Sequence, residues 1–156
     1  MIIIRLWQYK RIPYLDKQRL VAQWRECCCI AKNIADNGTP NHLLVNEVLN
    51  YPSIHFITYT NMVLNEMQKR GYKINEKACS NFYKNIQKGQ HYFHDKWTYP
   101  TVEYDNVFPS WHNDRYLIQC LFNLQEKADR QGITSVDWYK IYHNFERYIN
   151  GIYDRY

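Results

Sequence analysis

Several signatures of function are missing from this 156-residue sequence. No stretch reaches the roughly 18 apolar residues that a membrane-spanning helix needs, and the apolar opening MIII ends at Arg5. There is no glycine-rich phosphate loop, no G-x-S-x-G and no H-E-x-x-H. We therefore expect a soluble protein without a membrane partner. It would be cytoplasmic, or viral and acting in the host cell.

Cysteine is present, but its arrangement suits neither disulfides nor a metal. The count is five, an odd number, and three of the five are consecutive at 27–29. Consecutive residues on a helix point about 100° apart, so three in a row cannot converge on one ion. We expect reduced thiols, with Cys27 and Cys28 in the core and Cys29 on a polar face, and no metal or other cofactor.

Tyrosine and positive charge are abundant. Aromatic residues make up 17% of the chain, tyrosine alone contributes 15 residues, and the net charge is +5. Basic charge combined with rings that can stack favours nucleic acid as the partner. A tyrosine-rich surface is also common on protein-binding domains, so composition leaves both classes open. The length suits one monomeric domain that buries roughly 70% of its unfolded surface around a single core.

The first helix is predicted from Asp16, a favourable N-cap, to Asp36, where the sequence DNG supplies a stop. Residues three, four and seven apart return to one side of a helix, so apolar and polar faces can be assigned. The predicted apolar stripe is Leu20, Trp24, Cys27 or Cys28, Ala31 and Ile34. The neighbouring polar face is Gln18, Arg25, Glu26, Cys29 and Lys32.

The same periodicity predicts further helices and an all-α fold. Residues 88–112 break the pattern, because they hold three histidines, two prolines, many rings and no helical period. So long a loop is expected to be functional or to wrap the core. Its histidines, His91, His94 and His112, are expected to be surface or hydrogen-bonding residues rather than metal ligands, since they lack an acidic or thiol partner. The further helices are expected over 41–51, from Ser53 to Gly71, from Asn75 through Ile86, from Asn113 to before Gly132, and from Ser135, as its cap, across VDWYKIYHNFERYI.

The pair Arg25 and Glu26 lies in the middle of the first predicted helix and is open to two interpretations. It could be a solvated helix face, which is the common case for adjacent charges. Alternatively, the carboxylate faces a cleft beside the N-terminal arm and Arg25 holds a phosphate. The residue types do not choose between these interpretations.

The order of motifs along the chain adds a resemblance. The segment YLDKQRLVAQWRE, residues 14–26, resembles the first-helix signature of the pyrimidine-dimer DNA glycosylases, the family of phage endonuclease V. Four further segments resemble that family in the same order and extend the similarity over nearly the whole chain. These segments are RLW at 5–7, NEMQKRGYKI at 65–74, WHND with LQEK between 111 and 127, and WYKIY at 138–142.

The resemblance implies an all-α, compact single-domain helical bundle over 1–156, with a long aromatic loop and an N-terminal arm against the first helix. It implies a DNA glycosylase with AP-lyase activity that removes a damaged base, by default a pyrimidine dimer, from double-stranded DNA that it bends. The Met1 α-amine would form a Schiff base that permits β-elimination, Glu26 would stabilise positive charge and move protons, and Arg25 would anchor a phosphate. The implied DNA-contacting residues are Arg5, Gln18, Arg19, Lys127, Trp138, Tyr139, Lys140 and Tyr142.

The chain also departs from the family pattern. Ile2 is bulky, so Met1 should be retained, and the extra residues before Arg5 could carry the amine roughly 10 Å from the site. Either MIII folds back, or the true start differs, or Lys10 or Lys17 supplies the amine. Cys29 stands where the family has a basic residue. A non-catalytic DNA-binding protein, a glycosylase for another modified base and a tyrosine-based interaction domain therefore stay open.

Overall fold

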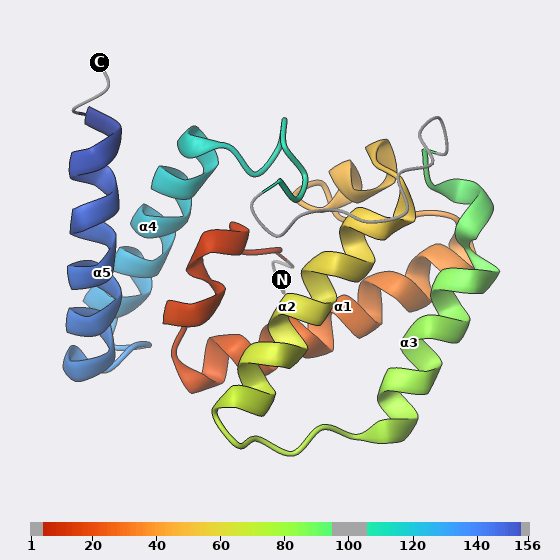
Figure 1. Cartoon of the computed structure of the whole chain (residues 1–156), viewed down its shortest axis with the longest axis horizontal. Coiled ribbons are helices and arrows are strands. Elements are labelled where there is room, and N and C mark those ends of the chain that lie inside the picture. Colours follow the sequence, from red (N-terminus) through yellow and green to blue (C-terminus); the bar gives the residue numbers. More distant parts are fainter. Residues whose placement is uncertain (1–4, 95–105, 154–156) are drawn as a thin grey trace.

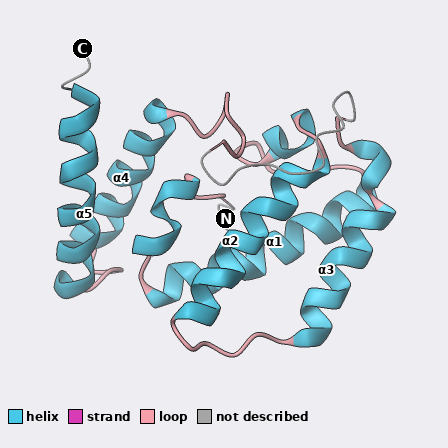
Figure 2. Cartoon of the chain, viewed as in Figure 1, coloured by secondary structure: helices cyan, strands magenta, loops and turns pink. Residues whose placement is uncertain are grey.

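The computed structural model describes residues 5–94 and 106–153, with the backbone alone for 147–149 and 151–153. This part of the chain contains α-helices and short 3-10 helices (η) and no strand, as Figures 1 and 2 show, so the all-α prediction is confirmed. No helix in these two ranges is both long enough and apolar enough to cross a bilayer. The elements are η1 (Tyr9–Tyr14), α1 (Lys17–Asn37), η2 (Asn46–Asn50), α2 (Ser53–Lys69), α3 (Glu76–Lys88), η3 (Gln90–Tyr92), α4 (Asp114–Asp129) and α5 (Ser135–Tyr153).

Two groups of helices enclose the N-terminal arm. Helix α1 packs against α2 and α3, and α4 packs against α5. In Figure 1 the arm and η1, in red, lie between these two groups. One core continues through both groups, because a single cluster of buried residues extends from Leu6 in the arm to Ile141 in α5. The predicted position of the arm against the first helix is confirmed.

Local chemistry accounts for most helix ends. The Asn75 side chain accepts a hydrogen bond from the backbone N–H of Ala78, and Asn113 does the same for Tyr116. Gly38 ends α1 with φ of 75°, a left-handed conformation in which glycine carries no steric cost. The predicted starts near Asn75 and Asn113 and the stop after Asp36 are therefore confirmed.

Two predicted caps are wrong. Asp16 occupies the N-cap position of α1 but makes no capping hydrogen bond, because its carboxylate lies 3.2 Å from the Arg19 guanidinium instead. Helix α5 begins at Ser135, but the Thr134 hydroxyl accepts the hydrogen bond from the Asp137 N–H at 3.1 Å. In the first case Arg19 competes with the helix N–H groups for the Asp16 carboxylate. In the second case Thr134 takes the capping position that the sequence pattern gave to Ser135.

The helix predicted over 41–51 is also wrong, because this segment is a tight turn followed by the short helix η2. Asn41 has a left-handed φ of 58°, and the Asn46 side chain accepts a hydrogen bond from the His42 N–H at 3.2 Å. Such local side-chain bonds offer the backbone an alternative to the α-helix. Val45 and Val48 are buried three residues apart, a spacing that fits a 3-10 helix.

The predicted stripe on α1 is confirmed, since Leu20, Trp24, Cys27, Ala31 and Ile34 are buried. Cys28, which was expected in the core as well, is half-buried and packs against its edge. The region predicted as a loop from 88 to 112 differs in part, because α3 extends to Lys88 and η3 follows it. Residues 106–112 wrap the core, as one alternative predicted, with Phe108 fully buried. Residues 95–105, which include Trp97, lie outside the described residues.

His112 is a hydrogen-bonding residue of the core. Its Nδ1 accepts a hydrogen bond from the Tyr9 N–H at 3.1 Å, and burial lowers the pKa of its ring to about 3. The ring is therefore neutral at physiological pH. His91 and His94 are exposed, as expected for surface histidines.

Candidate active site

Gln23 attaches the N-terminal arm to α1. Its side chain is fully buried. Its Oε1 accepts a hydrogen bond from the Trp7 N–H at 2.8 Å and lies 3.0 Å from the Tyr59 hydroxyl, while its Nε2 donates to the Arg5 carbonyl at 2.9 Å. The same Nε2 donates to Glu26 Oε2 at 3.1 Å. The glutamine thus uses both its donor and its acceptor groups to hold the arm and the glutamate together.

Other contacts hold the arm from the opposite side. The Tyr59 hydroxyl of α2 lies 2.6 Å from the Trp7 carbonyl oxygen, and the Tyr116 hydroxyl of α4 donates to the Leu6 carbonyl at 2.6 Å. Gln8 is buried and donates from Nε2 to the His112 carbonyl at 3.0 Å. Three helices and one loop therefore determine where Arg5 and Trp7 lie.

Glu26 is a carboxyl group with an unusual pKa. Desolvation by burial raises its pKa from 4.5 to about 7, although hydrogen bonds from the Arg5 backbone and the Gln23 side chain oppose this rise. Lys127 and Arg25 also lower the pKa through their positive charge. Both protonation states are consequently populated near neutral pH, which is the condition for a group that gives and takes protons.

Glu26 opens into a cavity of about 390 Å³ between the arm, α1 and α4. Four basic side chains line it, against the two carboxyl groups of Glu26 and Glu126, so the cavity favours an anionic ligand. Its volume falls in the range of small-molecule sites. The complete lining is Arg5, Trp7, Gln18, Arg19, Ala22, Glu26, Asn123, Glu126, Lys127 and Arg130.

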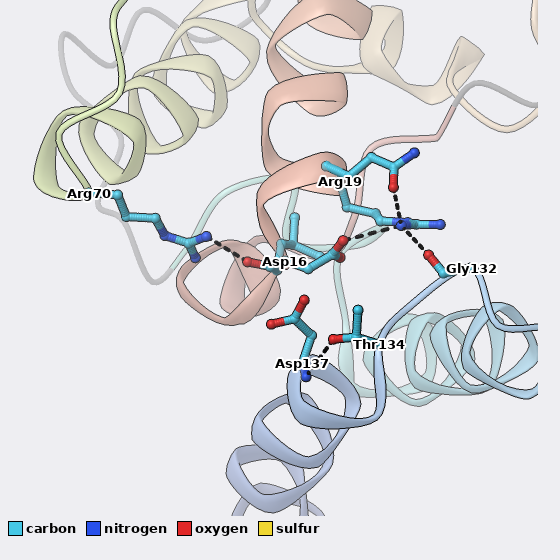
Figure 3. Close-up of polar contacts among 8 residues, drawn as sticks. Asp16, Arg19, Arg70, Gly132, Thr134 and Asp137 are labelled. Atoms are coloured by element: carbon cyan, nitrogen blue, oxygen red, sulfur yellow. Dashed lines mark hydrogen bonds and ion pairs between the residues drawn. The ribbon is translucent and has the colours of Figure 1, made fainter.

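Arg19, which lines this cavity, also has a structural role. Its Nη1 donates to the Gly132 carbonyl at 2.7 Å, to Gln18 Oε1 at 3.1 Å and to Asp16 at 3.2 Å. Figure 3 shows these contacts converging between the start of α1 and the connection from α4 to α5. Arg19 therefore joins the two groups of helices at the edge of the cavity.

The structure brings together five of the predicted site residues and separates the others. Arg25 lines a different hollow of about 440 Å³, at the starts of α1 and α5. Met1 lies outside the described residues. The α5 residues do not line the Glu26 cavity: Trp138 packs against the core, while Tyr139, Lys140 and Tyr142 are exposed. The five that share the cavity are Arg5, Gln18, Arg19, Glu26 and Lys127.

The amines proposed as substitutes and the unusual cysteine also lie elsewhere. Lys10 and Lys17 do not line the Glu26 cavity, and their ammonium groups lie 5.9 Å and 5.2 Å from the ring centres of Tyr9 and Tyr72. Cys29 is exposed and does not line the cavity either. Within the described ranges, no group of three or more His, Cys, Asp or Glu side chains is placed to hold a metal ion.

Sequence reasoning missed Gln23 and five residues that line the cavity, which are Trp7, Ala22, Asn123, Glu126 and Arg130. Arg130 and Asn123 belong to no motif. Each lies one turn from Lys127, Asn123 on α4 and Arg130 at its C-terminal cap, so spacing from Lys127 could have found them. The buried Asn123 Nδ2 makes no hydrogen bond to any of the described residues. The sequence did mark Gln23, because a glutamine beside an apolar helix stripe is expected to be buried and to need hydrogen-bond partners there.

A helical protein that holds a near-neutral carboxyl group in a basic cavity has the features of an enzyme that acts on an anionic substrate. The chain matches the family model described as pyrimidine dimer DNA glycosylase over residues 1–79, just over half its length, and it belongs to this family. It is therefore a DNA-repair glycosylase with DNA as its substrate. The match includes Arg5 and Glu26 but not α4 or α5. Comparisons with curated proteins and with solved structures find no match.

Proposed function

We propose that this glycosylase also cleaves the DNA strand as an AP lyase, with Glu26 as the group that transfers protons and a pyrimidine dimer as the lesion. The observation that supports this proposal is the pKa of Glu26, which burial raises to about 7. A carboxyl group that is half protonated at neutral pH can act as an acid in one step and as a base in the next.

The proposed reaction begins when a neutral amine attacks C1′ of the damaged nucleotide. The bond between nitrogen and C1′ forms, the glycosidic bond breaks, and the departing base takes the bonding electrons. The nitrogen, now positively charged, releases a proton, which passes to the base. Glu26 then gives its proton to O4′ as the sugar ring opens to a protonated Schiff base. The resulting carboxylate accepts a proton from C2′, and the bond from C3′ to its phosphate oxygen breaks in β-elimination.

The amine in this proposal is the α-amine of Met1, with Lys127 as the alternative. The backbone N–H of Arg5 is hydrogen-bonded to Glu26, so the chain reaches the catalytic carboxyl group four residues after Met1. Lys127 lines the same cavity and lowers the pKa of Glu26 by its charge. Lys10 and Lys17 are weaker candidates, because neither lines the cavity.

Double-stranded DNA would bind across the basic cavity through its phosphates. Arg5, Lys127 and Arg130 supply positive charge there, and Gln18 lies beside them. We propose that Arg25 and the exposed α5 residues contact flanking parts of the duplex. We further propose that residues 1–156 act as one domain, since the buried cluster extends through both groups of helices, and that this domain works as a monomer. The exposed α5 residues are Tyr139, Lys140 and Tyr142, and half-buried Trp138 beside them completes the proposed contact set.

Borohydride trapping on UV-irradiated duplex tests this function. The wild-type protein is expected to nick the irradiated strand and to form a covalent adduct, and Glu26→Gln is expected to bind the duplex without nicking it. Peptide mapping then locates the adduct on Met1 or on Lys127, with Lys10→Ala as the matched lysine control. Binding without adduct or nicking would contradict the proposal and favour a non-catalytic DNA-binding protein.

A further inference from the structure

Two leucines project from the turn that precedes η2. The side chain of Leu43 is 89% exposed and that of Leu44 is 40% exposed. They are the central residues of a turn closed by the hydrogen bond from the Val45 N–H to the His42 carbonyl at 3.0 Å. Fully buried Val45 anchors this turn in the core. Two adjacent apolar side chains are thus held outward on a turn that the protein fixes.

These leucines, called here the leucine turn, line a second hollow beside the Glu26 cavity. The hollow has a volume of about 670 Å³. Trp111 and Arg115 also line it, and Arg5 lines both this hollow and the Glu26 cavity. The two hollows therefore share Arg5, and the leucine turn lines the hollow next to the one that holds Glu26.

Helix α4 forms a continuous wall along both hollows. Arg115 and Gln119 line the hollow of the leucine turn, while Asn123, Lys127 and Arg130 line the Glu26 cavity. Steps of three and four residues keep these side chains on one side of the helix. From Arg115 to Arg130 the wall is about 22 Å long, which is the axial length that roughly six phosphates of one DNA strand occupy. Charge and length both fit a DNA duplex.

We propose that the leucine turn is an apolar wedge that enters duplex DNA at the base step beside the nucleotide held at Glu26. This inference rests on the proposed function. Extruding a nucleotide leaves unstacked apolar base faces, and minor-groove proteins commonly fill such steps with leucine or other apolar side chains. Leu43 and Leu44 supply such side chains, while Arg5 and Arg115 beside them neutralise the adjoining phosphates.

The experiment uses a duplex that carries an abasic site and 2-aminopurine as the neighbouring base, whose fluorescence rises when it is unstacked. Wild-type protein is expected to raise this fluorescence several-fold on binding. Leu43→Ala combined with Leu44→Ala is expected to remove most of the rise. Val136→Ala is the control, because Val136 is 66% exposed on α5 and lines neither hollow. Circular dichroism establishes that each variant is folded.

A second readout compares cleavage of the duplex with cleavage of the same abasic strand in single-stranded form. The double leucine variant is expected to lower the ratio of duplex to single-strand cleavage rates about tenfold, since a single strand needs no unstacking. A folded double variant that keeps the full fluorescence rise, or loses both cleavage rates equally, overturns the wedge. If wild-type protein cleaves neither substrate, the proposed function fails, while the fluorescence on binding still decides the wedge.

Discussion

Replacing Gln23 with leucine tests whether this residue holds the arm and the Glu26 carboxyl group together. The change keeps the approximate volume but removes the acceptor of the Trp7 N–H and the donor to the Arg5 carbonyl. A buried polar group left without a partner costs about 1–3 kcal/mol. One such group is the fully enclosed Trp7 N–H and the other is partly buried, so we expect the free energy of unfolding to fall by about 2–4 kcal/mol.

Urea denaturation followed by circular dichroism measures this loss. Gln68→Leu is a suitable control, because Gln68 is an exposed glutamine on α2 and surface substitutions usually stay within about 0.5 kcal/mol. If Gln23→Leu unfolds at the same urea concentration as Gln68→Leu, the idea that Gln23 clamps the arm is refuted.

If Glu26 transfers protons as proposed, the same substitution is expected to change the pH dependence of catalysis, which a purely structural role would not do. The hydrogen bond from Gln23 lowers the pKa of Glu26, so removing it should raise that pKa above about 7. The carboxyl group would then stay protonated to higher pH. In single-turnover strand cleavage, we expect the limb of the pH profile that reports Glu26 to move toward alkaline pH. An unmoved profile in a folded variant would show that Gln23 does not tune Glu26.

Further perturbations address other parts of the molecule. Glu26→Gln is expected to abolish strand cleavage while DNA affinity in a filter-binding assay stays nearly intact, and full activity would exclude Glu26 from catalysis. The folded pKa of His112, about 3, lies below its ordinary value of 6.5, so its contribution to stability is complete above pH 6.5 and declines as the pH falls toward 3. We expect about 2 kcal/mol of unfolding free energy to be lost between pH 7 and pH 5, and a folded His112→Gln variant should show a smaller loss in urea titrations at the two pH values. If Lys127 is the nucleophile, Lys127→Ala abolishes the borohydride adduct; with Met1 as the nucleophile the adduct persists, as it should in Lys10→Ala. Arg130→Gln should reduce the slope of log affinity against log salt by about 1, and an unchanged slope would mean that Arg130 contacts no phosphate.

The helices were predictable where their signals are local. Asn75 and Asn113 cap helices because a side chain reaches a backbone N–H only three residues away. The predictions failed where a residue had a choice of partners. Asp16 binds Arg19 rather than the helix start, and the Asn46 side chain binds the His42 N–H in the segment predicted to be helical. The local sequence shows which partners are available to a side chain, but it does not show which of them the side chain will bind.

The site was predictable in part for a similar reason. Glu26, Gln18 and Arg19 share a helix, so their common face follows from spacing. Lys127 was predicted as a site residue only from the family resemblance, and it lines the same cavity. Arg130 was missed because no motif marks it. Its spacing from Lys127 was a usable signal, but only the tertiary structure places both residues across the cavity from Glu26.

Sequence alone thus determined the helical class, most helix boundaries and the buried stripe of α1, because these depend on relations between residues a few positions apart. Only the tertiary structure decided the state of Glu26. Burial raises its pKa, and that burial exists because Gln23 and Tyr59 hold the arm in place while α4 closes the cavity from the other side. Desolvation is the sum of contacts from distant segments, and so it is a property of the fold rather than of the Arg-Glu pair.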